Sequence, residues 1–384
     1  YDLQMVSQVW RGITWRHTIR IVHPPKVRYG HTAVLYITGD GPNDEELKLF
    51  TPVTFLIQAP IAILYNVPNQ PLFGGLREDD LIAHTFVKFL ETGDETWPLL
   101  LPMTKSAVKA MDAIQEFAKK EWDAKVEGFM VTGASKRGWT TWLTAVVDRR
   151  VIGIAPLVYD NLNIPAQMPH QLEMWGRYSE QISEYVKRGL LDKMETERGK
   201  RLVNIVDPYF YLDRLALPKL IVTGTNDRYW TIDALNFYWD ALPGEKWVLY
   251  VPNSGHGLED TSRVMSTLVA FFHYIAGGIR FPKLDWRHIS SGRRAILSLT
   301  ANPMPVGARL WVATSKTLDF RESKWRAIPM RRRGKEFVGE IEPPKGKNLA
   351  LFGEADFRIG TLRFSLSTTV RIVRSSEGVS FTSA

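Results

Sequence analysis

One serine of the chain stands where its hydroxyl oxygen could act as a nucleophile. Ser135 lies in the run VTGASKRG, residues 131–138, where a short apolar segment ends in Gly-x-Ser and a helix-compatible segment follows at once. This strand–turn–helix pattern is typical of a nucleophile elbow, a tight turn that exposes the serine oxygen. The usual pattern has glycine two places after the serine, but Arg137 stands there and glycine follows at Gly138. A serine that merely caps a helix is the alternative interpretation.

A serine hydroxyl is a weak nucleophile and needs a base, which in turn needs a group that orients it. Asp227 and His256 each follow a short apolar segment that is predicted to be a strand. The order serine, aspartate, histidine along the chain is that of the α/β-hydrolase fold. The sequence therefore predicts a catalytic triad with Ser135 as nucleophile, His256 as base and Asp227 as acid. Asp160 is the carboxylate to consider next for the acid.

Attack on a carbonyl places negative charge on its oxygen, which two backbone N–H groups of an oxyanion hole can stabilise. In this fold the residue after the nucleophile, here Lys136, donates one, and a loop after the third strand donates the other. We take residues 62–67 as the third strand, so the loop is VPNQPL, residues 67–72. Proline has no N–H to donate, which leaves Asn69 and Gln70 as candidate donors. An ordinary polar turn is the alternative for this loop.

The scaffold that must hold these residues alternates strands with helical segments up to about residue 280. Such alternation predicts an α/β fold, a mainly parallel sheet with helices on both faces. The predicted strands are residues 15–21, 32–38, 62–67, 128–132, 151–159, 220–223 and 247–251, and the predicted helices are residues 78–90, 106–119 and 262–274.

The connection over residues 161–217 is much longer than a single connecting helix requires. Long connections in compact domains are typically lids or binding elements, so we expect a cap insertion over the site. Within it, residues 171–188 have helical spacing and several aromatic side chains. Trp175 and Tyr178 from this segment, together with Trp230, are candidate substrate-binding residues. The alternative is that these aromatic side chains pack the insertion's own core.

Beyond Phe281 the pattern changes to short alternating runs separated by Pro, Gly and Asn, which predicts an all-β module. We expect an α/β-hydrolase catalytic domain over residues 1–280 and an immunoglobulin-like β-sandwich domain over residues 284–384. From residue 284 onward there are 18 Lys and Arg against 9 Asp and Glu, a surplus of +9, while the whole chain carries +8. We expect this charge on an outward surface, where it permits at most weak contact with an anionic surface. Without interleaved aromatic residues, nucleic-acid binding is not expected.

Some classes of protein are excluded by what the sequence lacks. There is no cysteine, which excludes disulfides, thiolate metal sites and a cysteine nucleophile. No HExxH, Walker A or dinucleotide-binding motif occurs, so we expect neither a metal nor a cofactor. The apolar stretches are shorter than the roughly 18 residues of a membrane-spanning helix.

Several motifs together resemble the PhoPQ-activated pathogenicity-related proteins. They are VPNQPL (67–72), LPMTK (101–105), GASKRGW (133–139), TND (225–227), PNSGH (252–256), DFR (319–321) and FSLST (364–368), and they extend over nearly the whole chain. The resemblance implies an α/β-hydrolase domain followed by an immunoglobulin-like domain. It also implies an exported protein, secreted or periplasmic, whose signal peptide is not part of this chain.

A more limited resemblance is to the glucuronoyl esterases, in which a basic residue directly follows the serine of Gly-x-Ser and helps to hold the oxyanion. It implies that role for the side chain of Lys136, for which an ion pair or exposure to solvent is the alternative.

We expect a serine hydrolase that works through an acyl-enzyme on a small-molecule ester, a carboxylesterase. The first alternative is a serine peptidase of the aminopeptidase or dipeptidyl-peptidase kind, because the same triad cleaves amides and a cap can restrict entry to peptide ends. The second is a secreted, non-catalytic binding or signalling protein built on a hydrolase scaffold.

Overall fold

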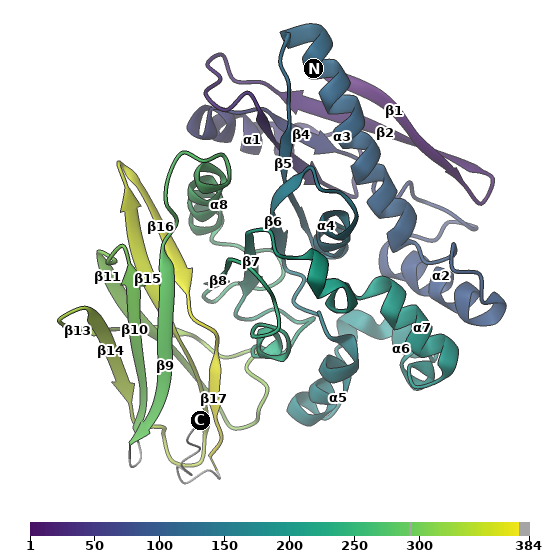
Figure 1. The fold of residues 1–384 in the computed structure, drawn as a ribbon. Coiled ribbons are helices and arrows are strands. Elements are labelled where there is room, and N and C mark those ends of the chain that lie inside the picture. Colours follow the sequence, from purple (N-terminus) through teal and green to yellow (C-terminus); the bar gives the residue numbers. More distant parts are fainter. Residues whose placement is uncertain (292–293, 376–384) are drawn as a thin grey trace.

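The computed structural model describes residues 1–291 and 294–375. Its first eight strands form one sheet in the order β1-β2-β4-β3-β5-β6-β7-β8 (Figure 1). Neighbouring strands run parallel from β4 to β8, whereas β2 pairs antiparallel with β1 and with β4. The predicted α/β-hydrolase fold is confirmed. The strands are β1 (Asp2–Trp10), β2 (Ile13–Val22), β3 (Thr32–Ile37), β4 (Ile61–Leu64), β5 (Gly128–Ala134), β6 (Val151–Leu157), β7 (Lys219–Gly224) and β8 (Lys246–Val251).

Helices cover both faces of this sheet. Because successive side chains of a strand point to opposite faces, β5 sends Phe129 and Val131 into one apolar core and Met130 into the other. A strand buried on both faces is expected to be apolar throughout, as β5 nearly is. The helices that pack on the first side are α2 (Glu78–Thr92), α3 (Leu100–Trp122) and α4 (Lys136–Val147), and those on the second are α1 (Asp44–Ile57) and α8 (Thr261–Ile275).

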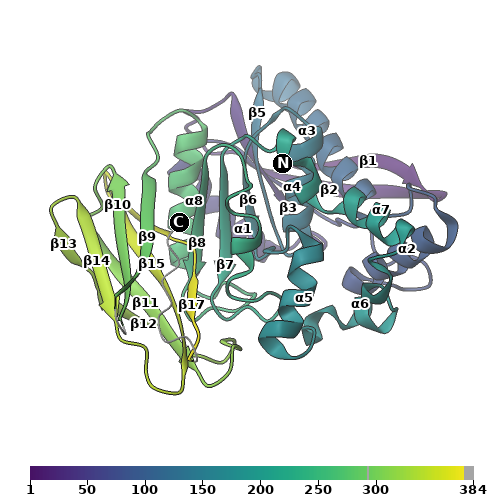
Figure 2. The same ribbon diagram turned by 60° about the horizontal axis from the view of Figure 1, so that its bottom comes forward.

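The insertion between β6 and β7 is mostly helical and lies beside α2 (Figure 2). Residues 171–188 do not form the single helix that their spacing predicted. The first helix ends at Trp175 because Gly176 takes the left-handed conformation, with φ 69°, that glycine commonly supplies just beyond a helix. The elements are α5 (Ile164–Trp175), α6 (Ser183–Lys187) and α7 (Glu197–Val206), with short 3₁₀ turns at Glu180–Ile182, Leu191–Lys193 and Pro208–Arg214.

The C-terminal part is a β-sandwich of two antiparallel sheets, as predicted, while its immunoglobulin type stays a prediction. One sheet has the order β13-β14-β10-β9, and the other has β16-β15-β11-β12 with β17 against β15. Strand β16 also pairs with β8 through Ser367 and Val248, so this second sheet continues the hydrolase sheet. The strands are β9 (Lys283–Ser291), β10 (Arg294–Asn302), β11 (Gly307–Ser315), β12 (Arg326–Pro329), β13 (Arg331–Arg333), β14 (Glu336–Ile341), β15 (Asn348–Ile359), β16 (Leu362–Ser367) and β17 (Arg371–Val373).

The densest basic run of the sandwich lies on its surface. All three arginines of β13 are exposed, which avoids the cost of burying an unpaired charge. A charge that is buried here is paired: Glu354 lies between Arg263 and Arg309. The last nine residues of the predicted domain, 376–384, and residues 292–293 lie outside the described residues. Within the described ranges, no helix is long and apolar enough to cross a membrane.

Candidate active site

Ser135 occupies a strained turn between β5 and α4. Its backbone has φ 57° and ψ −125°, a conformation that residues other than glycine rarely adopt and that clusters at functional sites. Its N–H donates to Leu157 O of β6 at 2.8 Å, which fixes the turn against the sheet. The side chain makes no capping hydrogen bond to α4, so the helix-capping interpretation is not supported.

The two glycines of the motif allow this turn to be tight. A Cβ atom added at Gly133 would lie 2.8 Å from Arg137 O, and one added at Gly138 would lie 2.9 Å from Leu157 O. These separations are shorter than real Cβ contacts, so both positions need glycine. Gly138 thus makes the close approach to β6, which explains why the chain departs from the usual spacing.

Arg137 stands where the usual motif has glycine because its side chain points across the carboxyl ends of β3 and β4. The guanidinium donates to Val67 O at 2.6 Å and to both carboxylate oxygens of Glu78 at 2.7 Å. Gly39 leaves the space for it, since a Cβ there would lie 1.7 Å from Arg137 Nη2. Arg137 therefore links the elbow to the start of α2, and it does not line the cavity beside Ser135.

Asp227 and His256 lie in the loops that follow β7 and β8, and the structure brings them together. His256 Nδ1 lies 2.8 Å from Asp227 Oδ2, while Asp227 Oδ1 accepts the backbone N–H of Tyr229 at 2.8 Å. The Asp227 side chain is only 3% exposed. A carboxylate beside Nδ1 favours the tautomer that carries its proton there, which leaves Nε2 free to accept one. Among the described residues, His256 Nε2 is buried and has no hydrogen-bond partner.

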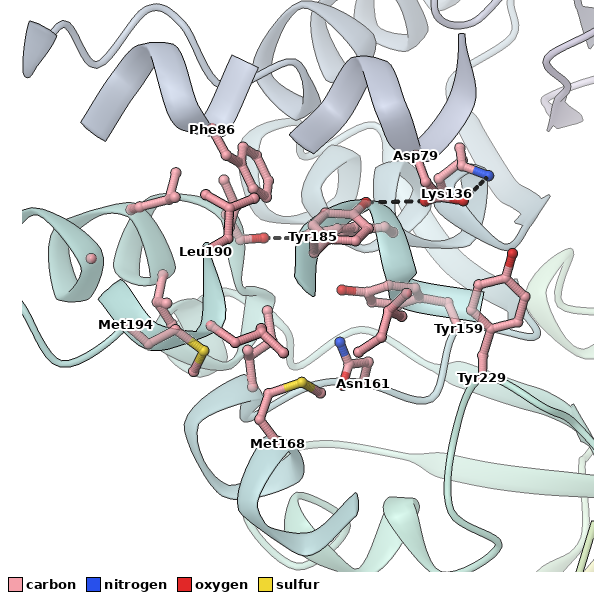
Figure 3. Close-up of a pocket in the computed structure, with 18 of the residues that line it drawn as sticks. Asp79, Phe86, Lys136, Tyr159, Asn161, Met168, Tyr185, Leu190, Met194 and Tyr229 are labelled. Atoms are coloured by element: carbon pink, nitrogen blue, oxygen red, sulfur yellow. Dashed lines mark hydrogen bonds and ion pairs between the residues drawn. The ribbon is translucent and has the colours of Figure 1, made fainter. Parts of the chain in front are cut away.

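Tyr229 packs directly on the histidine ring. The two ring centroids are 4.2 Å apart and the planes meet at 29°, a stacked arrangement. Tyr229 also lines the cavity beside Ser135 (Figure 3). Sequence reasoning missed this residue, and its position two places after Asp227, where its N–H can reach the carboxylate, is the only signal that could have found it.

Asp160 does not contact His256. Its carboxyl group accepts the hydroxyl of Tyr238 at 2.7 Å and is 2% exposed. Burial, together with the nearby charges of Asp227 and Asp233, raises the pKa of Asp160 to about 7, although the Tyr238 hydrogen bond opposes the shift. Asp160 is therefore a buried group behind the site.

The ammonium group of Lys136 is held in an ion pair, the alternative stated for it above. Its Nζ lies 2.9 Å from Glu78 Oε2 and 3.1 Å from Asp79 Oδ2, and its side chain is 9% exposed. Burial alone would raise the pKa of Glu78, but hydrogen bonds and charge from Arg137 and Lys136 hold it well below its usual value. The hydroxyl of Tyr185 also donates to Asp79 (Figure 3).

The predicted oxyanion donors of the 67–72 loop do not reach Ser135. The N–H of Gln70 donates to Pro68 O, and its side chain pairs with Glu78. The side chain of Asn69 pairs with the backbone of Arg16, and neither residue lines the cavity beside Ser135. The reason is topological: β1 is an additional first strand, so this loop follows β4, which β3 separates from β5. The loop that follows β3, residues 38–43, is the one next to the nucleophile strand.

A cavity of about 100 Å³ opens beside Ser135 under the insertion (Figure 3). Residues from 161–217 supply most of its wall, and the cap stays a prediction. Trp230, whose substrate contact stays a prediction, also lines it. Trp175 and Tyr178 do not: Trp175 lies under the guanidinium of Arg321, and Tyr178 lines an outer groove.

The C-terminal sandwich supplies none of the three triad candidates but contacts the loops that carry two of them. Asn226 Nδ2 donates to Arg321 O at 2.9 Å and to Ser323 O at 2.8 Å. Asn253 exchanges two hydrogen bonds with the backbone of Trp325. The connection between β11 and β12 is thus hydrogen-bonded to the two loops that carry Asp227 and His256.

Fold and site together define the class of this protein, an α/β-hydrolase that carries a serine at the elbow after β5 and an Asp–His pair in the loops after β7 and β8. The chain belongs to the family of PhoPQ-activated pathogenicity-related proteins, whose profile matches residues 1–321. It is 31% identical over 348 residues to autocrine proliferation repressor protein A of Dictyostelium discoideum, which covers 84% of this chain and 70% of that protein.

Solved structures with a similar chain trace include two enzymes. Acetyl xylan esterase 1 from Thermoanaerobacterium is 13% identical, with a TM-score of 0.48 over 73% of this chain and 83% of that one. The acylaminoacyl peptidase of Pyrococcus horikoshii is 14% identical, with a TM-score of 0.47 over 71% of this chain and 41% of that one.

Proposed function

We propose that this protein is a serine hydrolase that cleaves carboxylic esters through an acyl-enzyme on Ser135. One observation carries the proposal: Ser135 lies in a strained turn, and Tyr229, which lines the same cavity as Ser135, stacks on the histidine of the Asp227–His256 pair. The Nε2 atom of that histidine has no hydrogen-bond partner among the described residues. A buried imidazole nitrogen without a partner is costly unless something else uses it. Accepting the serine proton during attack is such a use.

The reaction follows from these positions. Ser135 Oγ attacks the ester carbonyl carbon while its proton passes to His256 Nε2, and the carbonyl oxygen becomes an oxyanion. When the carbon–oxygen bond to the alcohol breaks, His256 returns the proton to the departing alcohol. Water then repeats the sequence on the acyl-enzyme, which releases the acid and frees Ser135. Asp227 accepts Nδ1–H throughout and stabilises the imidazolium that forms.

The oxyanion needs donors that are already in place. Lys136 is the first residue of α4, and the first N–H groups of a helix have no acceptor within it. Its N–H and the positive end of the helix dipole favour negative charge beside Ser135. We assign the second donor to the 38–43 loop, because it follows the strand adjacent to β5.

We favour ester cleavage over cleavage at the end of a peptide because the carboxylates near Ser135 already form ion pairs within the chain. A substrate ammonium group needs an available carboxylate, but Glu78 and Asp79 already bind Lys136. Arg137 also binds Glu78, so these carboxylates are neutralised within the chain.

Turnover of p-nitrophenyl esters and of aminoacyl-arylamides by the wild type and by Ser135→Ala tests the proposal. We expect ester hydrolysis that falls by about 10⁴-fold or more in Ser135→Ala, as in other enzymes that lose their nucleophile. Near-normal ester turnover by Ser135→Ala would contradict the assignment. Faster cleavage of arylamides would instead favour a peptidase, and no Ser135-dependent turnover of either would favour a non-catalytic role.

A further inference from the structure

The cavity beside Ser135 is lined by a few charged and polar groups and by a larger apolar wall. Ser135, Asp79 and Lys136 are among the polar lining residues. Most of the remaining wall is made by aliphatic, thioether and aromatic side chains from α2 and the cap, among them Val203. Phe86 and Met168 of this wall can be seen in Figure 3. We propose that this cavity binds the acyl group of the substrate and restricts it to a short aliphatic chain of about four carbons beyond the carbonyl, a limit set by comparison with cavities of known contents. The inference rests on the proposed ester hydrolysis at Ser135.

The chemistry of the wall decides which groups can enter. Phe86, Met168 and Val203 are all buried and present no hydrogen-bonding group toward a ligand. Tyr159 and Asn161 also line the cavity and carry polar groups. A charged or strongly polar chain that reached Phe86, Met168 and Val203 would lose its water and find no partner among these three side chains, which is costly. A methylene group gains about fourfold in binding when it leaves water for such a site.

The size of the cavity decides how long the chain can be. Its volume is about 100 Å³. An engineered apolar protein cavity of about 150 Å³ binds one benzene molecule, which has six carbons. By proportion, this cavity holds about four carbons, as in a pentanoyl or isovaleryl group. An acetyl group would leave it mostly empty, and an octanoyl chain would not fit without movement of the cap.

The position of the histidine assigns the cavity to the acyl side of the ester. The leaving alcohol must take a proton from His256 Nε2 and must therefore lie beside that atom. Ser135 lines the cavity, whereas His256 does not. The part of the substrate that points into the cavity is consequently the part that stays on Ser135 when the alcohol leaves.

A series of p-nitrophenyl esters, from acetate through butyrate, pentanoate and octanoate to dodecanoate, tests the proposal on the full chain. We expect kcat/KM to rise by about fourfold per added methylene, hence about 15-fold from acetate to butyrate, because each methylene is buried. It should be highest at butyrate or pentanoate and fall by at least tenfold at octanoate. A parallel series of acetate esters with ethyl, butyl and octyl alcohols should show no such maximum.

Two variants change the cavity in opposite directions. Val203→Phe fills it from α7, and we expect kcat/KM for pentanoate to fall about tenfold more than that for acetate, because only the longer chain reaches the filled space. Met168→Ala enlarges it from α5 and should move the maximum to a longer ester. The matched control is Val186→Phe, which makes the same change on an exposed part of the cap away from the cavity.

The outcomes separate this inference from the function on which it rests. Ser135-dependent turnover with no preference for acyl length, or with a preference that follows the alcohol, would overturn the inference alone. So would equal losses on acetate and pentanoate in a folded Val203→Phe. If Val203→Phe does not fold, an unchanged maximum in Met168→Ala overturns it. Absence of any Ser135-dependent turnover would contradict the proposed function and the inference together.

Discussion

Asn253 and Trp325 exchange two hydrogen bonds across the boundary between the hydrolase domain and the sandwich. Asn253 Nδ2 donates to Trp325 O at 3.0 Å, and Trp325 N–H donates to Asn253 Oδ1 at 2.7 Å. His256 stands three residues further along the same loop. Asn226, directly before Asp227, makes a similar pair of contacts to the same connection of the sandwich. The sandwich therefore constrains both loops whose side chains must meet.

The first prediction follows from this constraint. Asn226→Ala and Asn253→Ala should each lower kcat between about 10- and 100-fold with little change in KM, because small displacements of reacting groups have effects of that size. Asn236→Ala is the matched control, since Asn236 Nδ2 also donates across the boundary, to Val370 O at 2.9 Å, but lies in the 3₁₀ turn Ala234–Phe237 and not beside Asp227 or His256 in the sequence. Steady-state kinetics and melting temperatures of the three variants make the comparison.

If kcat falls in all three variants, and by more in those whose melting temperature falls more, the contacts only stabilise the fold. Loss of kcat in Asn226→Ala and Asn253→Ala alone would show that they position the Asp227–His256 pair.

The second prediction concerns the arginine that replaces the usual glycine. Arg137 binds Glu78 with two hydrogen bonds and its side chain is 10% exposed. Breaking a buried pair costs about 3–5 kcal/mol, but Glu78 is 40% exposed, so we expect Arg137→Ala to lower the free energy of unfolding by about 2 kcal/mol. Arg201→Ala breaks a similar two-bond pair with Glu95 on the surface and should lower the free energy of unfolding much less, because water screens an exposed pair.

The pH dependence of that difference has a definite sign. The pKa of Glu78 is lower in the folded chain than its usual 4.5, so its contribution is present above pH 4.5 and is lost as the pH falls below it. The gap between wild type and Arg137→Ala in urea unfolding should therefore shrink from pH 7 to pH 3. A gap that widens as the pH falls would contradict the role given to this pair.

The third prediction concerns Asp160, whose pKa is raised in the folded chain, whereas that of Glu78 is lowered. Burial raises the pKa of Asp160 from 3.8 to about 7, so the folded chain holds a proton there that the unfolded chain has lost. This contribution is fully present below about pH 4 and is lost as the pH rises through 7. Asp160→Asn keeps an acceptor for Tyr238 but cannot ionise. Its stability should match the wild type at pH 4 and exceed it by about 4 kcal/mol at pH 8.

Thermal or urea unfolding of wild type and Asp160→Asn at pH 4 and pH 8 measures this difference. Equal stabilities at both pH values would show that Asp160 is ionised at no cost in the folded chain.

Local patterns made the scaffold predictable and pointed to the three triad candidates. The tight turn at Ser135 requires the nearby glycines Gly133 and Gly138. Asp227 and His256 each follow an apolar strand of ordinary length. These features depend on neighbours in the sequence, so one sequence was enough to find them.

Features that depend on distant contacts were missed. Strand β1 is half exposed along most of its length, so its apolar pattern is weak. Without it the strands were miscounted, and the oxyanion donors were placed on Asn69 and Gln70. The stacking of Tyr229 on His256 and the contact between Asn253 and Trp325 join loops whose approach only the folded chain shows.

The central claim is that Ser135 is a nucleophile activated by His256. Treatment with a fluorophosphonate, followed by mass analysis of the digested protein, tests it most directly, because the reagent reacts with activated serines without requiring the natural substrate. We expect one phosphonylated peptide, which contains Ser135, together with no labelling of Ser135→Ala and strongly reduced labelling of His256→Ala. A folded wild type that stays unlabelled, or a label that persists in Ser135→Ala, would contradict the claim.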